Sequence, residues 1–392
     1  MTPSILIVGA AGFTNLGDDA ILAAMLDELG DAVPGARFTV AGGGAAYGSE
    51  SLSSIPVETI EVRDVRAVDA AVARSDLVIL GGGGFIYDYD AIITPYDFLR
   101  GDVTFMYPYY RAAVSASVRG VPLYAYAVGI DSLVTPAGRA LTRDVLSRAQ
   151  AITVRDELSL LELRRAGVRC PVIEVTADPA IRIEAPEGTW GGRPAGRVVV
   201  FVTRPWLRFA GTWTESASHH YDTYVGWLAA AADHAVERWD STPIFLPGQR
   251  YADDDLETAA AVTARMHHGE RALHLEEIVD ERQYRAVLAG ADAVVSSRLH
   301  PLILAATATV PIVGLAITEK VRAFLVALGL GGQLVSPWAA SAPQLEAAID
   351  RAVGDADPLR EALRGGVARQ RERAARNPAI AADLLRQPVA TS

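Results

Sequence analysis

One stretch of the chain predicts both a fold and a site: Val294-Val295-Ser296-Ser297-Arg298-Leu299-His300-Pro301-Leu302-Ile303-Leu304-Ala305-Ala306. It has the pattern of a buried strand that ends in two serines and leads through a short turn into an apolar helix. Pro301 suits the first helical position, where the N–H that it lacks would have no partner. His300 is then expected at or near the N-cap, two residues after Arg298. Free N–H groups, a guanidinium and an imidazole would meet there, which indicates an anion site; the simpler interpretation is a helix that happens to begin with Arg and His.

On both sides of this stretch, short apolar runs alternate with helical patterns. The runs are typical of buried strands and lie at 5–8, 77–80, 123–128, 151–154, 172–175, 198–202, 243–246, 272–275, 293–295 and 311–315. Strands that alternate with helices predict parallel sheets covered by helices. A segment rich in Gly, Pro and charged residues, 184–196, separates two such halves.

We therefore predict an α/β protein of two Rossmann-like domains that face each other across a cleft, as in glycosyltransferases of the B type (GT-B). The predicted parts are an N-terminal domain over 1–185, a linker over 186–196, a C-terminal domain over 197–343 and C-terminal helices over 344–392. Ligands of such domains bind beyond the carboxyl ends of the strands, so the site is expected in the loops that follow them.

Charge and cysteine content exclude several classes of protein. With 36 basic and 47 acidic residues the formal net charge is −11, which gives no overall attraction to nucleic acid or to anionic lipid. The single cysteine, Cys170, excludes an internal disulfide framework and a zinc–thiolate cluster. It fits a reducing compartment, so we expect a cytoplasmic protein.

Neither a signal peptide, a membrane span nor a metal site is predicted. Residues 1–9 lack a basic region and run directly into a glycine turn. The longest uncharged run, 301–318, approaches the length of a membrane span, but Pro311 divides it into a helix and a strand. His219 and His220 would point to opposite faces of an extended chain and have no partner at the spacing of metal ligands.

The first expected strand leads into a loop over 9–19, and a helix follows. Its glycines do not have the spacing G-x-G-x-x-G, so no dinucleotide is inferred. Asp18 and Asp19 fall in the first helical turn, where the helix dipole favours carboxylates. They fit equally well as capping groups and as a base or a ligand for a substrate hydroxyl.

A second glycine-rich stretch, 81–84, follows the strand expected at 77–80. Four glycines there indicate that another backbone or a ligand comes close. The next segment, 87–110, holds six of the 13 tyrosines of the chain. Such rings suit stacking on sugars or a protein interface, and equally well a lid that packs on itself.

Several short motifs follow one another along both halves of the chain. They are G-x5-N-x-G-D-D-A at 9–20, a glycine-loop strand at 75–83, R-D-x-x-S at 155–159, D-P at 178–179, R-P-W at 204–206, S-R-L-H at 297–300 and K-V-R-A-F-L at 320–325. Together and in this order they resemble the motifs of the polysaccharide pyruvyltransferase family. Asp19 stands where the family usually has Glu, which preserves the charge.

The resemblance implies transfer of a pyruvyl group from phosphoenolpyruvate to two hydroxyls of a sugar, giving a cyclic ketal and phosphate. Phosphoenolpyruvate carries a carboxylate and a phosphate, so an acidic protein has to bind it through local cations. We expect Arg204 and Arg298 to be these anchors, because guanidinium groups form paired hydrogen bonds with oxyanions. Backbone N–H groups around Leu299 and His300 would add to the phosphate site. Lys320, the single lysine, is either a third cation near the donor or a surface residue.

The implied reaction also requires proton transfers. We expect His300 to act as a general acid/base on the leaving phosphate or the methylene group, since an imidazole readily gains and loses a proton near neutral pH. Asp18 or Asp19 is the candidate base for the acceptor hydroxyl. No metal and no cofactor are expected, and phosphoenolpyruvate serves as a co-substrate.

The acceptor-binding residues are expected in the N-terminal half. They are Asn15, Gly82, Gly83, Tyr87 and Tyr89. The acceptor itself stays open between a sugar or glycan, a glycosylated metabolite and a lipid-linked sugar, and the last would bring the protein into peripheral contact with a membrane. The segments 87–110 and 209–224 match no pattern of the family, and the sequence makes no prediction of an oligomeric state.

Two other functions compete with this one. A nucleotide-sugar glycosyltransferase would have the same architecture, but Thr318-Glu319 is the only candidate for a ribose-binding carboxylate after the Arg298 helix. A non-catalytic assembly protein would keep the fold for binding alone. The presence of Arg204, Arg298 and His300 together argues against it.

Overall fold

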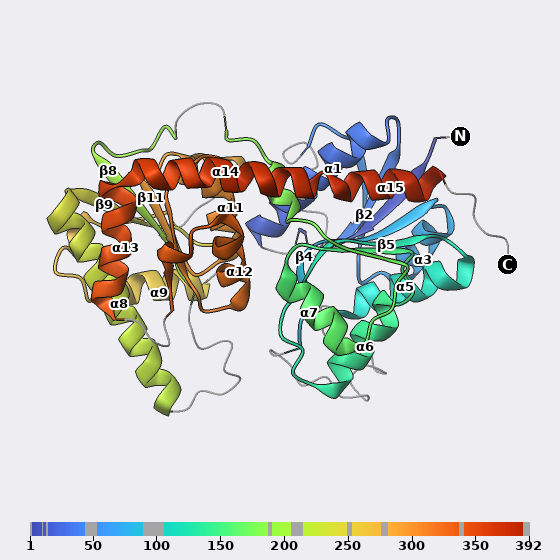
Figure 1. Ribbon diagram of the computed structural model, residues 1–392, viewed down its shortest axis with the longest axis horizontal. Coiled ribbons are helices and arrows are strands. Elements are labelled where there is room, and N and C mark those ends of the chain that lie inside the picture. Colours follow the sequence, from blue (N-terminus) through green and yellow to red (C-terminus); the bar gives the residue numbers. More distant parts are fainter. Residues whose placement is uncertain are drawn as a thin grey trace. The chain divides into compact units, whose positions relative to one another are not determined.

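The computed structural model describes residues 2–9, 11–12, 15–43, 53–88, 106–186, 190–204, 215–248, 253–275, 281–336 and 341–386. The chain forms two compact units (Figure 1). The N-terminal unit consists of Met1–Arg182 together with Gln370–Ser392, and the C-terminal unit of Ile183–Arg369. Each unit is a parallel sheet with helices on both faces, which confirms the predicted α/β fold of two Rossmann-like units.

The N-terminal unit contains a seven-stranded sheet in the order β3-β2-β1-β4-β5-β6-β7. Its strands are β1 (Ser4–Val8), β2 (Arg37–Gly42), β3 (Val57–Glu61), β4 (Leu77–Ile86), β5 (Leu123–Ile130), β6 (Ala151–Val154) and β7 (Val172–Val175). All the pairings are parallel. The strand order reverses between β1 and β4, which is where ligands bind in open α/β sheets.

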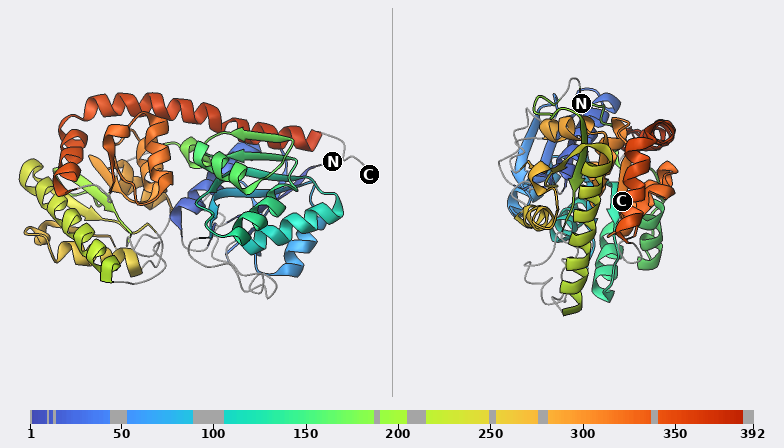
Figure 2. Two further views of the ribbon diagram at one scale, coloured as in Figure 1. Left: turned by 60° about the horizontal axis from the view of Figure 1, so that its bottom comes forward. Right: turned by 90° about the vertical axis from the view of Figure 1, so that its left-hand side faces the viewer.

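Helices cover both faces of this sheet. They are α1 (Leu16–Ala32), α3 (Val65–Ala73), α5 (Met106–Arg119), α6 (Pro136–Leu146), α7 (Glu157–Ala166), the short 3-10 helix η1 (Pro179–Arg182) and α15 (Arg376–Arg386). α3, α5, α6 and α7 lie in a row on one face, and α1 and α15 lie side by side on the other (Figures 1 and 2). The core between the sheet and α3, α5, α6 and α7 consists mainly of Val, Ile, Leu and Ala side chains.

The C-terminal unit contains a six-stranded sheet in the order β10-β9-β8-β11-β12-β13. Its strands are β8 (Arg197–Val202), β9 (Ser241–Phe245), β10 (Leu273–His274), β11 (Ala293–Ser296), β12 (Ile312–Leu315) and β13 (Leu334–Val335). The strand order reverses between β8 and β11. β11 belongs to the stretch Val294–Ala306, so that stretch leaves the sheet at the point where the order reverses.

The helices of this unit also lie on both faces of the sheet (Figure 1). They are α8 (Glu215–Trp239), α9 (Asp253–Thr263), η3 (Gly269–Arg271), α10 (Glu281–Ala289), α11 (Leu299–Thr307), α12 (Glu319–Leu328), η4 (Gly331–Gln333), α13 (Ala342–Gly354) and α14 (Ala356–Ala374). No helix in the described parts of the chain has the length and apolar character needed to cross a membrane.

The last helix, α15, belongs to the N-terminal unit and is anchored there by a buried asparagine. Asn377 is fully buried. Its side-chain oxygen accepts a hydrogen bond from Thr176 Oγ1 at 2.8 Å, and its Nδ2 donates to the carbonyl of Ala177 at 3.3 Å. The Tyr124 hydroxyl donates to its backbone carbonyl at 3.2 Å. The predicted C-terminal helical segment 344–392 is therefore divided, because these contacts join its last part to β5 and to the residues after β7.

Candidate active site

Two of the predicted anion-binding residues leave the C-terminal sheet side by side. Val202, the last residue of β8, pairs with Ser296, the last residue of β11. Arg204 and Arg298 each follow two residues later. The structure thus brings the arginines of two separate motifs to one edge of the sheet, at the point where the strand order reverses.

Two buried serines hold this edge together. The Ser297 N–H donates to the carbonyl of Val202 at 3.1 Å, and the Arg204 N–H donates to Ser297 Oγ at 3.0 Å. The Arg298 N–H in turn donates to Ser296 Oγ at 2.9 Å. Both serines are completely buried. They therefore fix the backbone of both arginines rather than react.

The guanidinium of Arg298 is held by Asp255, a residue of α9. Arg298 Nη2 donates to Asp255 Oδ1 at 2.7 Å, and the Gly248 N–H donates to Asp255 Oδ2 at 2.9 Å. The side chain of Asp255 is 1 % exposed and that of Arg298 is 15 % exposed. Sequence patterns did not indicate this partner, because 43 residues separate the two and no motif includes Asp255.

Helix α11 begins two residues earlier than predicted. Arg298 has extended backbone angles and is the N-cap, so Leu299 is the first helical residue and Pro301 the third. Proline causes no loss at the third position, since that N–H also lacks a partner within the helix. The side chain of Arg298 makes no capping hydrogen bond to the first turn. His300 is half-buried at the second position and Leu299 is buried.

Lys320 lies close along the same edge of the sheet. It is the second residue of α12, which follows β12, and β12 pairs with β11. The side chain of Lys320 is half-buried. Arg204, Arg298 and Lys320 therefore follow three adjacent strands, and a role for Lys320 near an anion stays a prediction.

In the N-terminal unit, the residues 15–19 begin helix α1. Asn15 is the N-cap, and its side-chain oxygen accepts a hydrogen bond from the Gly17 N–H at 3.0 Å. Asp19 is 3 % exposed and accepts from the Gly12 N–H at 2.8 Å. Asp18 is half-buried. Of the two carboxylates, Asp19 thus stabilises the glycine turn, and Asp18 is the more accessible one.

The glycines 81–84 form part of strand β4 rather than the loop that the sequence indicated. β4 continues to Ile86 and pairs with β5 through an irregularity between Gly83 and Ile86. A Cβ on Gly82 would lie 2.2 Å from Ile21 Cγ2, and one on Gly83 would lie 2.8 Å from Asp18 Oδ1. Helix α1 therefore accounts for the close approach at both glycines, and acceptor binding by Gly82 and Gly83 stays a prediction.

Tyrosines gather near Asp18. Tyr87 is half-buried after β4, and Tyr109 of α5 is 4 % exposed. Burial raises the pKa of Tyr109, and the nearby charge of Asp18 and the Tyr87 hydroxyl raise it further. These groups thus lie close enough together to influence one another. Tyr89, also predicted to bind the acceptor, lies outside the described residues.

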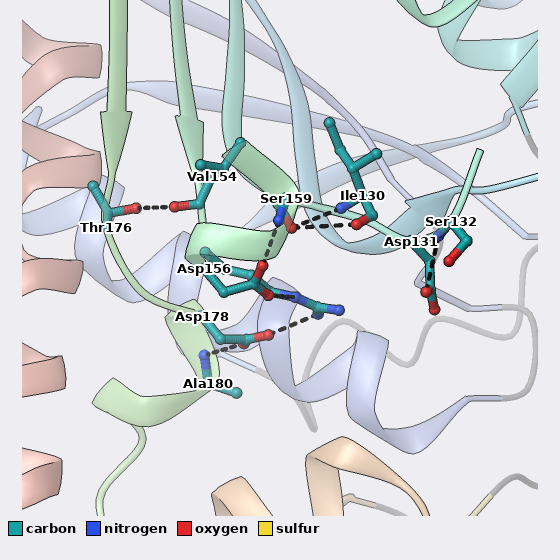
Figure 3. Close-up of polar contacts among 10 residues, drawn as sticks. Ile130, Asp131, Ser132, Val154, Asp156, Ser159, Thr176, Asp178 and Ala180 are labelled. Atoms are coloured by element: carbon teal, nitrogen blue, oxygen red, sulfur yellow. Dashed lines mark hydrogen bonds and ion pairs between the residues drawn. The ribbon is translucent and has the colours of Figure 1, made fainter. Parts of the chain in front are cut away.

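The R-D-x-x-S and D-P motifs meet in space at the carboxyl ends of β6 and β7 (Figure 3). Arg155 Nη1 donates to Asp178 Oδ2 at 3.0 Å, and Arg155 Nε lies 3.6 Å from Asp156 Oδ2. Asp156 also caps α7 by accepting from the Ser159 N–H at 2.7 Å. Burial by itself lowers the pKa of Arg155, but the carboxylates of Asp178, Asp156 and Asp131 raise it.

Glycines make room for this buried guanidinium. A Cβ on Gly129 would lie 2.5 Å from Arg155 Cζ, and one on Gly84 would lie 3.0 Å from Arg155 Nη2. The Arg155 cluster (Arg155, Asp156 and Asp178) therefore braces the ends of β4 and β5. The sequence motifs include all three residues, but only the structure indicates that they form one cluster of ion pairs.

The chemistry of the two units differs. The C-terminal unit gathers Arg204, Arg298 and the start of α11, which can bind an anion. The N-terminal unit gathers Asp18 and tyrosines, which can accept hydrogen bonds from sugar hydroxyls or remove a proton from one. Among the described residues, no group of three or more His, Cys, Asp and Glu side chains is placed to hold a metal ion.

The sequence model of the polysaccharide pyruvyl transferase family matches residues 15–319. The chain belongs to this family. The matched region begins at Asn15 and includes Arg155, Asp178, Arg204 and Arg298, so both edges described above lie within the part that defines a polysaccharide pyruvyl transferase. Lys320 and the helices α13–α15 follow after it. No curated protein matches the chain in sequence.

Solved structures show the same fold at low sequence identity. A putative UDP-N-acetylglucosamine 2-epimerase from Listeria monocytogenes has a TM-score of 0.64 at 12 % identity and covers 96 % of this chain and 94 % of its own. Alr3699/HepE from Anabaena, solved in complex with UDP-glucose, has a TM-score of 0.58 at 14 % identity and covers 97 % and 98 %. These similarities confirm that this polysaccharide pyruvyl transferase has a GT-B-like fold.

Proposed function

We propose that this polysaccharide pyruvyl transferase uses phosphoenolpyruvate as its donor and forms a pyruvate ketal on two hydroxyls of a sugar or glycan. The observation that carries the proposal is the emergence of Arg204 and Arg298 from the paired residues Val202 and Ser296. Two guanidinium groups at one edge suit a small donor with one carboxylate and one phosphate. The first turn of α11 adds the positive end of a helix dipole, which favours an oxyanion.

The proposed reaction balances two proton transfers. One acceptor hydroxyl adds to C2 of phosphoenolpyruvate while the methylene carbon gains a proton and becomes a methyl group. The second hydroxyl replaces the phosphate at C2, and its proton leaves with the phosphate. No redox step occurs, so the proposed reaction requires neither an oxidant nor a reductant.

We assign the proton transfers to one group in each unit. His300, in the first turn of α11, is the proposed acid/base for the methylene or the phosphate. Asp18 is the proposed base for the acceptor hydroxyl, in preference to Asp19. The preference follows from the hydrogen bond between Asp19 and the Gly12 N–H and from the deeper burial of Asp19.

Donor binding tests the proposal directly. Phosphoenolpyruvate should raise the melting temperature by mass action, by an amount equivalent to about 2.7 kcal/mol at a hundredfold excess over its dissociation constant. Arg298→Ala should weaken its binding by about 10- to 100-fold, on the scale of one or two charge-assisted hydrogen bonds. Arg193→Ala, which removes an arginine paired with Asp292 at the opposite edge of the same sheet, should leave binding unchanged.

His300→Gln tests the chemical step. It should reduce phosphate release in the presence of an acceptor by about 10²- to 10⁴-fold, because one positioned acid/base is lost. Binding of phosphoenolpyruvate, measured by calorimetry, should change little. Equal rates of phosphate release in the variant and the parent would remove His300 from the mechanism.

A second function is favoured by one observation, the UDP-glucose bound to the similar Alr3699/HepE structure. A nucleotide-sugar transferase would be stabilised by UDP- or GDP-sugars and would release a nucleoside diphosphate. If such a sugar raises the melting temperature and phosphoenolpyruvate does not, the pyruvyl donor assignment is wrong.

A further inference from the structure

The guanidinium of Arg298 has a restricted set of free donors. An arginine carries five N–H groups. One of them, on Nη2, is bonded to Asp255, and the one on Nε is buried without a hydrogen-bond partner among the described residues. The other three N–H groups are terminal and have no hydrogen-bond acceptor within the described parts of the chain. The side chain can therefore contact a ligand through its terminal nitrogens Nη1 and Nη2, but not through a pair of hydrogen bonds that includes Nε.

Asp255 and Gly248 keep the guanidinium in that orientation. Asp255 is itself fixed, because its second oxygen accepts from the Gly248 N–H at 2.9 Å. Gly248 makes room for the arginine, since a Cβ there would lie 2.2 Å from Arg298 Cδ and 2.6 Å from its Nε. The neighbouring Tyr284 hydroxyl is buried, and burial raises its pKa, so this group stays uncharged beside Arg298.

We propose that Asp255 is a positioning residue that orients Arg298 so that the site prefers phosphoenolpyruvate to inorganic phosphate. The proposal rests on the proposed function, in which phosphate is the product that would compete with the donor. An arginine that is free to turn attracts any oxyanion through its charge, whereas one held from a fixed side binds well only in a set direction.

The negative charge of Asp255 also favours phosphoenolpyruvate over inorganic phosphate. It offsets part of the positive charge of Arg298, so a small anion that contacts this arginine alone gains little. Phosphoenolpyruvate carries a carboxylate and a phosphate at a fixed separation and can reach Arg298 and Arg204 together. Selectivity for the donor then comes from two oriented contacts rather than from net charge.

Asp255→Asn tests the proposal because it removes the charge and keeps the shape. In the parent, isothermal titration calorimetry should give a lower dissociation constant for phosphoenolpyruvate than for inorganic phosphate. In the variant, phosphate should bind more tightly, and the ratio of the two constants should shrink by about tenfold, on the scale of one charge-assisted hydrogen bond. Rising salt should weaken phosphate binding more in the variant than in the parent.

Gly248→Ala perturbs the same arginine without changing any charge. Its Cβ displaces the Arg298 stem, so phosphoenolpyruvate should bind more weakly while phosphate does not gain affinity. Circular dichroism establishes which variant is folded, and either variant suffices for the test. Asp292→Asn is the matched control, since Asp292 also accepts from an arginine, Arg193, and from a backbone N–H, both at 2.8 Å, at the amino end of β11.

Three results would overturn the inference. One is an unchanged ratio of the two constants in Asp255→Asn. Another is the same change of ratio in Asp292→Asn. The third is a loss of phosphoenolpyruvate binding in Asp255→Asn as large as in Arg298→Ala, which would make Asp255 necessary for binding instead of orientation. A parent that does not bind phosphoenolpyruvate refutes the proposed function instead.

Discussion

The carboxyl edges of the two sheets each contain an arginine paired with a buried aspartate, but the surroundings of the two pairs differ. Arg155 in the N-terminal unit is 5 % exposed and has Asp178 and Asp156 within 3.6 Å. Arg298 in the C-terminal unit is 15 % exposed and, among the described residues, pairs with one carboxylate, that of Asp255. We infer from the number of nearby carboxylates that Arg155 has a structural role, whereas Arg298 can still bind an anion.

This contrast explains why the same residue type serves two purposes. A guanidinium with more than one carboxylate has its charge fully offset, and glycines at 84 and 129 enclose it. Such a guanidinium, that of Arg155, stabilises the fold through its buried ion pair with Asp178 and has no role in binding a ligand. A guanidinium with a single carboxylate retains donors for a ligand. The following predictions test the contrast, beginning with the largest expected effect.

Replacing Arg155 with Met should give the largest loss of stability. The change leaves Asp178 and Asp156 without their cation, and removing one partner of a buried pair costs about 3–5 kcal/mol. Urea unfolding measures the loss. The folded variant should still bind phosphoenolpyruvate with the affinity of the parent.

Arg74→Ala is the control for this prediction. Arg74 is 46 % exposed and pairs with the exposed Glu58, so its loss should cost at most about 1 kcal/mol. If Arg155→Met costs no more than this control, or if the folded variant fails to bind phosphoenolpyruvate, Arg155 is not a structural brace and the contrast disappears.

Glu28 offers a further comparison, because it is a buried carboxylate whose arginine partner is exposed to solvent, unlike Arg155. Glu28 is buried in α1, and its partner Arg182, at 2.7 Å, is 41 % exposed. Burial raises the pKa of Glu28 from 4.5 to about 7, although the Tyr126 hydroxyl and Arg182 act to lower it. The folded protein therefore holds this proton more tightly than the unfolded chain between pH 4.5 and about 7.

The sign of the pH dependence follows from this pKa. As the pH rises through that window, the folded state loses stability relative to the unfolded one, by on the order of 3 kcal/mol in total. Glu28→Gln cannot ionise and should lack this loss. Urea unfolding at pH 4.5, 6 and 8 measures it, with Glu58→Gln as an exposed control. Parallel pH profiles of the parent and Glu28→Gln would contradict the prediction.

The smallest expected effect concerns Gly83. Comparing its substitution with that of Gly35 distinguishes the cost of backbone strain from the cost of a steric clash with Asp18. Gly83 has φ +99° and its Cβ would approach Asp18 Oδ1 to 2.8 Å, whereas Gly35 has φ +80° with nothing within 4 Å. Gly35→Ala should cost about 1 kcal/mol through strain alone. Gly83→Ala should cost about 1 kcal/mol more, because Asp18 has to move. Equal losses in thermal unfolding would show that Asp18 adapts freely.

The strands that the sequence failed to predict are those without a continuous apolar run. These include β2 (Arg37–Gly42), in which the polar Arg37 and Thr39 interrupt the apolar residues. They also include β3 (Val57–Glu61), an edge strand in which exposed polar residues separate the half-buried Val57 and Ile60. β13 has only two residues. The buried central strands were predicted, because strands covered on both faces consist of Val, Ile and Leu. The glycines of β4 have the pattern of a loop, since glycine is rare in strand interiors.

Those residues of the candidate site that belong to a sequence motif could be predicted, and the others could not. S-R-L-H and R-P-W indicated Arg298 and Arg204, and the parallel sheet brings both to one edge. Asp255 could not be predicted, because an aspartate in the first turn of a helix usually only caps it. The pairing of Arg155 with Asp178 was equally inaccessible, since 23 residues and a helix lie between them.

The return of the chain to the N-terminal unit has a consequence for its synthesis. The N-terminal unit needs Gln370–Ser392, whereas the C-terminal unit is the continuous segment Ile183–Arg369. During translation the segment made later can therefore complete its fold first, in contrast to the usual order of domains. Until Asn377 leaves the ribosome, Thr176 and the Ala177 carbonyl lack the partner that they have in the finished protein. The first half of the polypeptide is thus the last to mature, and nascent chains that stop short of α15 should remain sensitive to proteases there.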